Sequence, residues 1–118
     1  MNTRHIGDMG ETKAAAYLKK NGCNILKRNY CIRGGEVDII FTEGDTTVFC
    51  EVKTRNQKRF GTTAEAVTLA KQKRICRAAL DYVSKNKNID ENYRFDIIEI
   101  DNGKINHLKN AFEFIEPI

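Results

Sequence analysis

Residues 34–55 read Gly-Gly-Glu-Val-Asp-Ile-Ile-Phe-Thr-Glu-Gly-Asp-Thr-Thr-Val-Phe-Cys-Glu-Val-Lys-Thr-Arg, and they place ionisable side chains between β-branched and aromatic residues. Both halves of this stretch have the composition of β-strands. Gly44-Asp45 between them suits a tight two-residue turn. The sequence therefore predicts an antiparallel hairpin at the centre of the fold.

The hydrophobic pattern selects the register of this hairpin. With Gly44 and Asp45 as the central turn residues, Asp38 lies opposite Glu51 and Glu36 lies opposite Lys53, all on one face. The other face is then apolar throughout: Val37, Ile39, Phe41, Val48, Cys50 and Val52. A shift by one residue would mix the two faces, so we expect the first register.

This register brings two like charges together. Opposed Cβ atoms lie about 4.5 to 5.5 Å apart, so Asp38 and Glu51 would repel each other. A divalent cation, a shared proton or the ammonium of Lys53 could each offset that repulsion.

The composition indicates one domain over residues 1–118. The chain is 41% hydrophobic and 31% charged, which is ordinary for a globular protein and argues against disorder. Its longest apolar runs have the length of strands, so we expect a cytoplasmic protein with no membrane partner and no signal peptide. The cysteines lack paired spacing, which indicates buried reduced thiols at Cys23, Cys31, Cys50 and Cys76.

The net charge of +4 is unevenly distributed along the chain. A basic segment follows the hairpin and contains a single acidic residue, Glu65. Its basic residues are Arg55, Lys58, Arg59, Lys71, Lys73, Arg74 and Arg77. Such a run is often only a solvated face, but its position beside the carboxylates favours binding of nucleic-acid phosphates.

The remaining elements follow from periodicity. We expect a helix over residues 3–21 with Glu11 at the border of its apolar stripe, and a strand over residues 23–32. A second helix begins either at the Thr62-x-x-Glu65 capping box or at Thr68. Its apolar stripe is predicted as Leu69, Cys76, Leu80 and Val83, with Ile75, Ala79 and Tyr82 adjoining it.

Two more strands complete the expected fold. Residues 93–100 and 105–108 form a second hairpin around a turn at residues 101–104, and residues 110–118 form a short helix or a cover. A right-handed crossover through the second helix sets residues 93–100 parallel to the preceding strand. The expected fold is therefore α/β, with a mixed sheet, an antiparallel hairpin core and flanking helices in the order αβββαββ.

The hairpin carboxylates suit a hard cation. Mg²⁺ or Mn²⁺ commonly takes one or two protein carboxylates, here Asp38 and Glu51, and the carbonyl of Val52 could add a ligand. Lys53 could orient or deprotonate the attacking water. From spacing alone, two cross-strand salt bridges, one of them between Glu36 and Lys53, explain the pattern equally well.

Several motifs in order along the chain resemble a known family. Besides Gly-Glu-Val-Asp-Ile-Ile and Val-Phe-Cys-Glu-Val-Lys-Thr-Arg, they are Gly7-x-x-Gly10-Glu11, Arg28-Asn29-Tyr30, Phe60-Gly61, Glu65-Ala66-Val67, Lys71-Gln72-Lys73-Arg74-Ile75, Arg94-Phe95-Asp96 and Asn110-Ala111-Phe112. The series resembles the bacterial YraN family within the PD-(D/E)XK nuclease superfamily, whose relatives include Holliday-junction resolvases. The resemblance implies the restriction-endonuclease-like fold.

The resemblance also implies roles for individual residues. Asp38 and Glu51 match the metal-binding carboxylates, Lys53 matches the catalytic lysine, and Glu11 matches an acidic residue of the first helix near the metal. Gln72 and Glu36 are candidate supporting residues. Val37 stands where the motif's namesake proline would be, which makes the short motif less diagnostic.

The leading hypothesis is a Mg²⁺- or Mn²⁺-dependent DNA endonuclease, structure-selective for branched DNA and, by analogy with resolvases, a homodimer. A non-catalytic nucleic-acid-binding module with the same fold is the alternative. A protein-interaction domain indifferent to DNA is a third hypothesis.

Overall fold

The computed structural model describes residues 3–55, 67–86 and 92–116, with the backbone alone for residues 3–8. The elements in chain order are α1 (Thr3–Lys20), β1 (Asn24–Ile32), β2 (Gly35–Glu43), β3 (Thr46–Arg55), α2 (Leu69–Lys85), β4 (Asn92–Asp101) and β5 (Lys104–Leu108). This order confirms the predicted αβββαββ arrangement. The Thr62-x-x-Glu65 motif lies outside the described residues.

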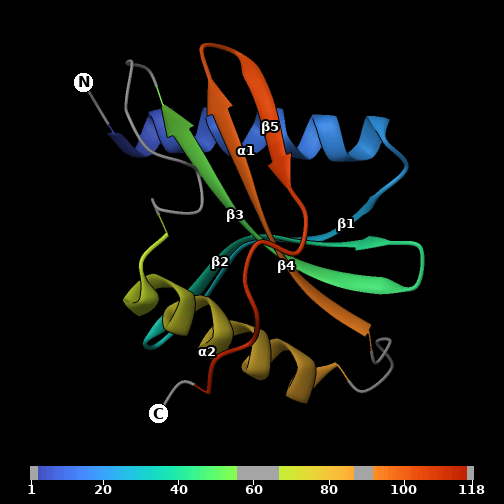
Figure 1. Ribbon diagram of the computed structural model, residues 1–118, viewed down its shortest axis with the longest axis vertical. Helices are drawn as coiled ribbons and strands as arrows, with labels where there is room; N and C mark the ends of the chain where they lie inside the picture. Colours follow the sequence, from blue (N-terminus) through green and yellow to red (C-terminus); the bar gives the residue numbers. More distant parts are fainter. Residues whose placement is uncertain (1–2, 56–66, 87–91, 117–118) are drawn as a thin grey trace.

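The strands form one mixed sheet of five strands in the order β1-β2-β3-β4-β5. β3 and β4 pair in parallel, as the crossover through α2 requires, and the other neighbours are antiparallel. Figure 1 shows α1 and α2 on different sides of this twisted sheet. The predicted α/β class is therefore confirmed.

The central hairpin has the predicted register over its turn end. Cα pairing runs from Glu43 and Thr46 to Ile39 and Cys50, and Gly44 supports the turn with a φ of 59°. Beyond that point the contact between the strands passes through a side chain, since a carboxylate oxygen of Asp38 accepts the backbone N–H of Val52 at 2.8 Å. The hairpin thus ends in a polar contact where regular pairing stops.

Both faces of the sheet carry an apolar core. Ile39, Phe41 and Cys50 pack in a cluster with residues of α1, while Ile40 and Phe49 pack with residues of α2. Val37 packs on the α2 side, so the predicted placement of Val37 with Ile39 is wrong. The strand alternation changes between Val37 and Ile39, which pair with Tyr30 and Arg28 on either side of Asn29, and Asn29 has a φ of 53°. The bulge-like register shift of β1 lies elsewhere, between Ile25 and Lys27.

Thr68 caps α2, which confirms one of the two predicted starts. Its side chain accepts the N–H of Lys71 at 3.2 Å. The predicted apolar stripe is wrong at two positions, because Leu69 and Leu80 are 58% and 46% exposed. The buried residues of the helix are Ile75, Cys76, Ala78, Ala79 and Tyr82.

Gly35 explains where the buried face of α2 lies. A Cβ built on Gly35 would stand 2.7 Å from the carbonyl oxygen of Arg74 and 2.9 Å from the nitrogen of Ala78. The helix backbone therefore rests directly on the start of β2. That contact turns Ile75, Ala78 and Tyr82 toward the sheet and leaves Leu80 toward solvent.

The C-terminal segment covers the α2 side of the sheet. Phe112 and Ile115 pack against that core, and the ring of Phe112 stacks on Phe95 with centroids 5.1 Å apart. Within residues 109–116 the segment contains no helix, so the predicted cover is confirmed and the predicted short helix is wrong.

The cysteines are free of disulfides, and Cys23, Cys50 and Cys76 are buried as predicted. Cys31 is exposed, because it lies on the outward side of the edge strand β1. In the portion of the chain that the structure describes, neither helix combines the length and apolarity needed to cross a bilayer.

Replacement of Gly35 by alanine should cost about 1 to 3 kcal/mol in the free energy of unfolding, because the added methyl meets helix backbone that cannot move aside. Urea denaturation measures this cost. Gly44→Ala is the matched control, since a Cβ there meets no atom within 4 Å and costs only the strain of a φ of 59°. Equal costs for the two variants would show that the contact between β2 and α2 is not tight.

Candidate functional site

Two carboxylates from adjacent strands meet where the central hairpin stops pairing. Asp38 comes from β2 and Glu51 from β3, and the side chain of Glu51 is only 2% exposed. The two carboxyl groups are close enough to share a hydrogen bond. The predicted proximity of Asp38 and Glu51 is therefore present in the structure.

Burial is the main reason that the pKa of Asp38 lies well above its usual range. The hydrogen bond to Glu51 and the charge of Glu51 raise the pKa further, while the N–H of Val52 opposes the shift. Like charges so close cannot both ionise easily, which favours the protonated form of Asp38.

Lys71 of α2 supplies the positive charge nearest to Glu51. Its Nζ lies 2.6 Å from Oε2 of Glu51. Burial alone would lower the pKa of Lys71, but the hydrogen bond and charge of Glu51 outweigh that effect and raise it. The sequence assigned Lys71 only to phosphate binding, whereas the structure places it within the carboxylate cluster.

Lys53 stands beside Lys71 at the same end of β3. The pKa of Lys53 is lowered, first by burial and then by the hydrogen bond and positive charge of Lys71, with Glu51 and Asp38 partly opposing the shift. A lysine with a lowered pKa releases its proton more readily and can act as a base. The predicted role of Lys53 stays a prediction, and after burial Lys71 is the residue that lowers the pKa of Lys53.

Glu11 approaches the cluster from α1. Its side chain is 8% exposed, and its charge adds a small upward contribution to the pKa of Asp38. The preceding Gly10 lies so close to β3 that a Cβ there would stand 2.1 Å from Oγ1 of Thr54. This tight packing places Glu11 near the polar end of the hairpin.

The donor set fits a hard divalent cation. Among the residues that the structure describes, no three His, Cys, Asp or Glu side chains are arranged to hold a metal, so Glu11 is not placed with Asp38 and Glu51 as the predicted third carboxylate ligand. Mg²⁺ usually keeps several waters and uses one or two carboxylates, so Asp38 and Glu51 could hold it. Their roles as ligands, like that of the Val52 carbonyl, stay predictions.

The predicted phosphate-binding residues have different surroundings. Arg55 pairs with Glu99 at 2.5 Å, and both side chains are mostly buried. Arg74 lies 3.8 Å from Glu36, and Arg77 donates to the carbonyl of Gly34 at 3.3 Å. Lys53 was the predicted cross-strand partner of Glu36. The structure pairs Glu36 with Arg74 of α2.

Two other predicted residues lie on the same helix. Lys73 is partly exposed. Gln72 donates its amide to the carbonyl of Val67 at 3.0 Å, which ties it to the helix start rather than to the carboxylates. Lys58 and Arg59 lie outside the described residues.

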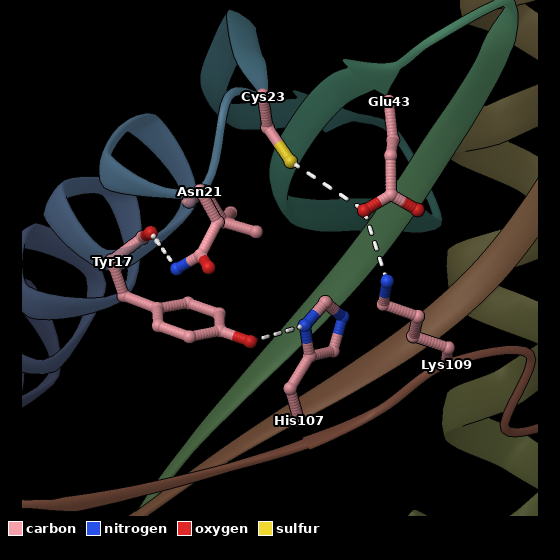
Figure 2. Close-up of a pocket in the computed structure, with 7 residues that line it drawn as sticks. Tyr17, Asn21, Cys23, Glu43, His107 and Lys109 are labelled. Carbon is pink, nitrogen blue, oxygen red and sulfur yellow. Dashed lines mark hydrogen bonds and ion pairs between the residues drawn. The ribbon is translucent and has the colours of Figure 1, made fainter.

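A second polar cluster joins α1 to the edge of the sheet. Figure 2 shows the hydroxyl of Tyr17 directed at the ring of His107, and the carboxylate of Glu43 between Cys23 and Lys109. These residues line a cavity of about 160 Å³. Glu43 also pairs with Arg94 at 3.0 Å, and Arg94 in turn pairs with Asp96, so the cluster is continuous with the contacts of Asp96.

Asp96 is the buried anion of this network. Its carboxylate is 0% exposed and accepts from Nε2 of His107 at 2.7 Å and from Nε of Arg94 at 2.8 Å. Because a carboxylate only accepts, Nε2 of His107 donates, and Nδ1 of a neutral ring then accepts from Tyr17 at 3.0 Å. Burial would raise the pKa of Asp96, but these hydrogen bonds lower it.

The sequence contained one signal for the position of Lys71. It lies four residues before Ile75 and seven before Ala78, so it heads the buried stripe of α2. The prediction missed this because it chose a different stripe. Of the network around Asp96, the sequence showed only the Arg94-Phe95-Asp96 motif, because Tyr17 and His107 are distant in sequence and join it only through the tertiary fold.

Comparison with known proteins assigns the chain to a family of bacterial proteins. The model described as "Uncharacterised protein family UPF0102" matches residues 10–100. A UPF0102 protein of Caldicellulosiruptor saccharolyticus is 48% identical over 95% of this chain and 100% of its own length. One from Geobacter metallireducens is 41% identical over 96% of both chains, and one from Alkaliphilus oremlandii is 47% identical over 92% of this chain and 98% of its own.

Asp38→Asn should stabilise the metal-free protein at pH 8 by about 1 kcal/mol, seen as a rise of a few degrees in melting temperature. An acid whose folded pKa is raised loses stability as pH rises from its ordinary value of 3.8 toward the raised value, and asparagine avoids this loss. The gain should vanish below the ordinary value. Asp45→Asn, in the exposed turn, should change the melting temperature little. A less stable Asp38→Asn protein at pH 8 would contradict the raised pKa of Asp38.

Asp96→Asn should destabilise the protein by about 3 kcal/mol at pH 7, because Arg94 loses a buried partner. A carboxylate with a lowered pKa contributes stability above its ordinary pKa and loses it as the pH falls through the lowered value. The difference from wild type, measured by urea unfolding, should therefore shrink in acid. A constant difference down to pH 3 would contradict an ionised Asp96.

Proposed function

The chain belongs to the family described as Uncharacterised protein family UPF0102, and we propose that it is a metal-dependent DNA endonuclease that hydrolyses a phosphodiester bond with Mg²⁺ or Mn²⁺. The observation that supports this most is the meeting of Asp38 and Glu51 beside Lys53 and Lys71 at one end of the central strands. Two carboxylates and two amines in a buried setting match the needs of phosphodiester hydrolysis.

Each residue then has a role in the proposed reaction. Asp38 and Glu51 hold the cation, with the Val52 carbonyl as a further ligand and Glu11 adding negative charge. A cation bound there would lower the pKa of a coordinated water and neutralise charge developing on the phosphoryl group. Lys53, whose pKa is already lowered, accepts the proton of the attacking water.

The substrate would be held by the basic side chains around this site. Lys73, Arg74 and Arg77 of α2 would contact phosphates, together with Arg55 and with Lys58 and Arg59 of the preceding segment. Such contacts do not read sequence and weaken as salt rises. Arg55 and Arg74 would exchange their present carboxylate partners for phosphate.

The resemblance to the PD-(D/E)XK superfamily supports the same proposal. It rests on Gly-Glu-Val-Asp-Ile-Ile and Glu-Val-Lys, with Val37 at the usual proline position. Its Holliday-junction-resolvase-like branch suggests branched DNA as the substrate. A homodimer would then supply the paired cuts that a four-way junction needs.

A non-catalytic nucleic-acid-binding module is the second candidate. It is favoured by the pairing of Lys71 with Glu51 and by the proton on Asp38, since both compensate the buried charge without a cation. This candidate predicts salt-sensitive DNA binding and no carboxylate-dependent heat when Mn²⁺ is titrated into the protein.

Cleavage of linear, flapped and four-way-junction DNA with Mg²⁺ or Mn²⁺ tests the proposed activity. Asp38→Ala and Lys53→Ala should each lower the rate by about 100-fold or more, because each removes a group acting on the reacting atoms.

Asp45→Ala and Lys104→Ala are the matched controls, since both residues are exposed, Asp45 in the turn of the first hairpin and Lys104 at the start of β5. They should cleave at the wild-type rate. Cleavage of no substrate by the wild type, or equal rates for wild type and Lys53→Ala, would refute the endonuclease proposal.

A further inference from the structure

Lys71 is positioned by the fold to meet Glu51. It lies in the first turn of α2, where Thr68 caps the helix, and it heads the stripe that buries Ile75 and Ala78. Its ammonium lies 2.6 Å from Oε2 of Glu51, a side chain that is 2% exposed. The contact therefore comes from the packing of α2 on the sheet and not from a chance surface encounter.

Because the carboxylate of Glu51 is buried, it needs a positively charged group beside it. A buried carboxylate without a counter-charge is costly, and the charge of Glu11 adds to the negative potential in the same region. Of the two lysines at the site, Lys71 forms the ion pair with Glu51. Its ammonium thus lies beside Oε2, where a cation bound to that oxygen would also stand.

We propose that Lys71 is a tethered counter-ion of the metal site, which neutralises Glu51 in the metal-free protein and is displaced when a divalent cation binds. This inference rests on the proposed metal-dependent function. Lys71 can leave because its side chain is 36% exposed and has a flexible four-carbon stem. Lys71 then competes with the metal and weakens metal binding in the wild-type protein.

Calorimetric titration of Mn²⁺ into the full chain, without DNA, tests the competition. Lys71→Met keeps the apolar stem and removes the charge, so it should bind Mn²⁺ about 10-fold more tightly than wild type. Lys71→Gln, which keeps a neutral hydrogen-bond donor, should change in the same direction. Lys73→Met removes the same charge two residues further along the helix, and its affinity for Mn²⁺ should stay within about twofold of wild type.

Thermal unfolding provides a second readout. In EDTA, Lys71→Met should melt below wild type because Glu51 has lost its counter-charge. Saturating Mn²⁺ should raise its melting temperature by more than it raises that of wild type, because the metal now replaces the missing ammonium. Lys71→Gln serves the same comparison if Lys71→Met does not fold.

The outcomes separate the inference from the function on which it rests. If wild type binds Mn²⁺ and the Lys71 variants bind it equally or more weakly, Lys71 is no competitor and the inference is overturned, while the metal site stands. If neither wild type nor any variant binds Mn²⁺, the metal-dependent function fails, and the tethered counter-ion fails with it.

Discussion

Burial of the Glu51 carboxylate in the middle of the sheet is the constraint on which the site depends. An isolated buried charge would cost several kcal/mol, so its neighbours must compensate it. Asp38 lies beside it from β2 with a raised pKa that favours the neutral form of Asp38, and Lys71 pairs with it from α2. The two strands and one helix that meet here are therefore held in register by electrostatics as well as by apolar packing.

The local backbone accommodates this cluster. Regular pairing of β2 with β3 stops after Ile39 and Cys50, and the N–H of Val52 is satisfied by the Asp38 carboxylate. A side chain thus replaces a backbone acceptor at the point where the hairpin opens. Gly35, further along β2, brings α2 close enough for Lys71 to reach into the opening.

Sequence reasoning predicted what depends on local pattern. The turn at Gly44-Asp45 and the period-two alternation were enough to give the hairpin register, and the Thr68 cap was visible as a helix start. The placement of Val37 failed because a backbone irregularity near Asn29 is invisible to a period-two rule. Lys71 was misread because the prediction took Leu69 and Leu80 as part of the buried stripe, whereas the close approach of α2 to Gly35 buries Ile75 and Ala78, the stripe that Lys71 heads.

The physical cost of the cluster bears on why the chain retains it. Both faces of the sheet are already filled by apolar clusters, so Asp38, Glu51 and Lys71 are not needed to complete the core. Well-packed apolar residues in place of a buried ion pair are often as stable or more stable. Moreover, the pKa of Asp38 is raised in the folded protein, so this carboxyl group lowers the stability of the fold at neutral pH. A stabilising role alone therefore accounts poorly for the cluster. The proposed chemical role of the two carboxylates and of Lys53, the lysine of lowered pKa, would account both for the loss of stability and for the position of these side chains at one end of the strands.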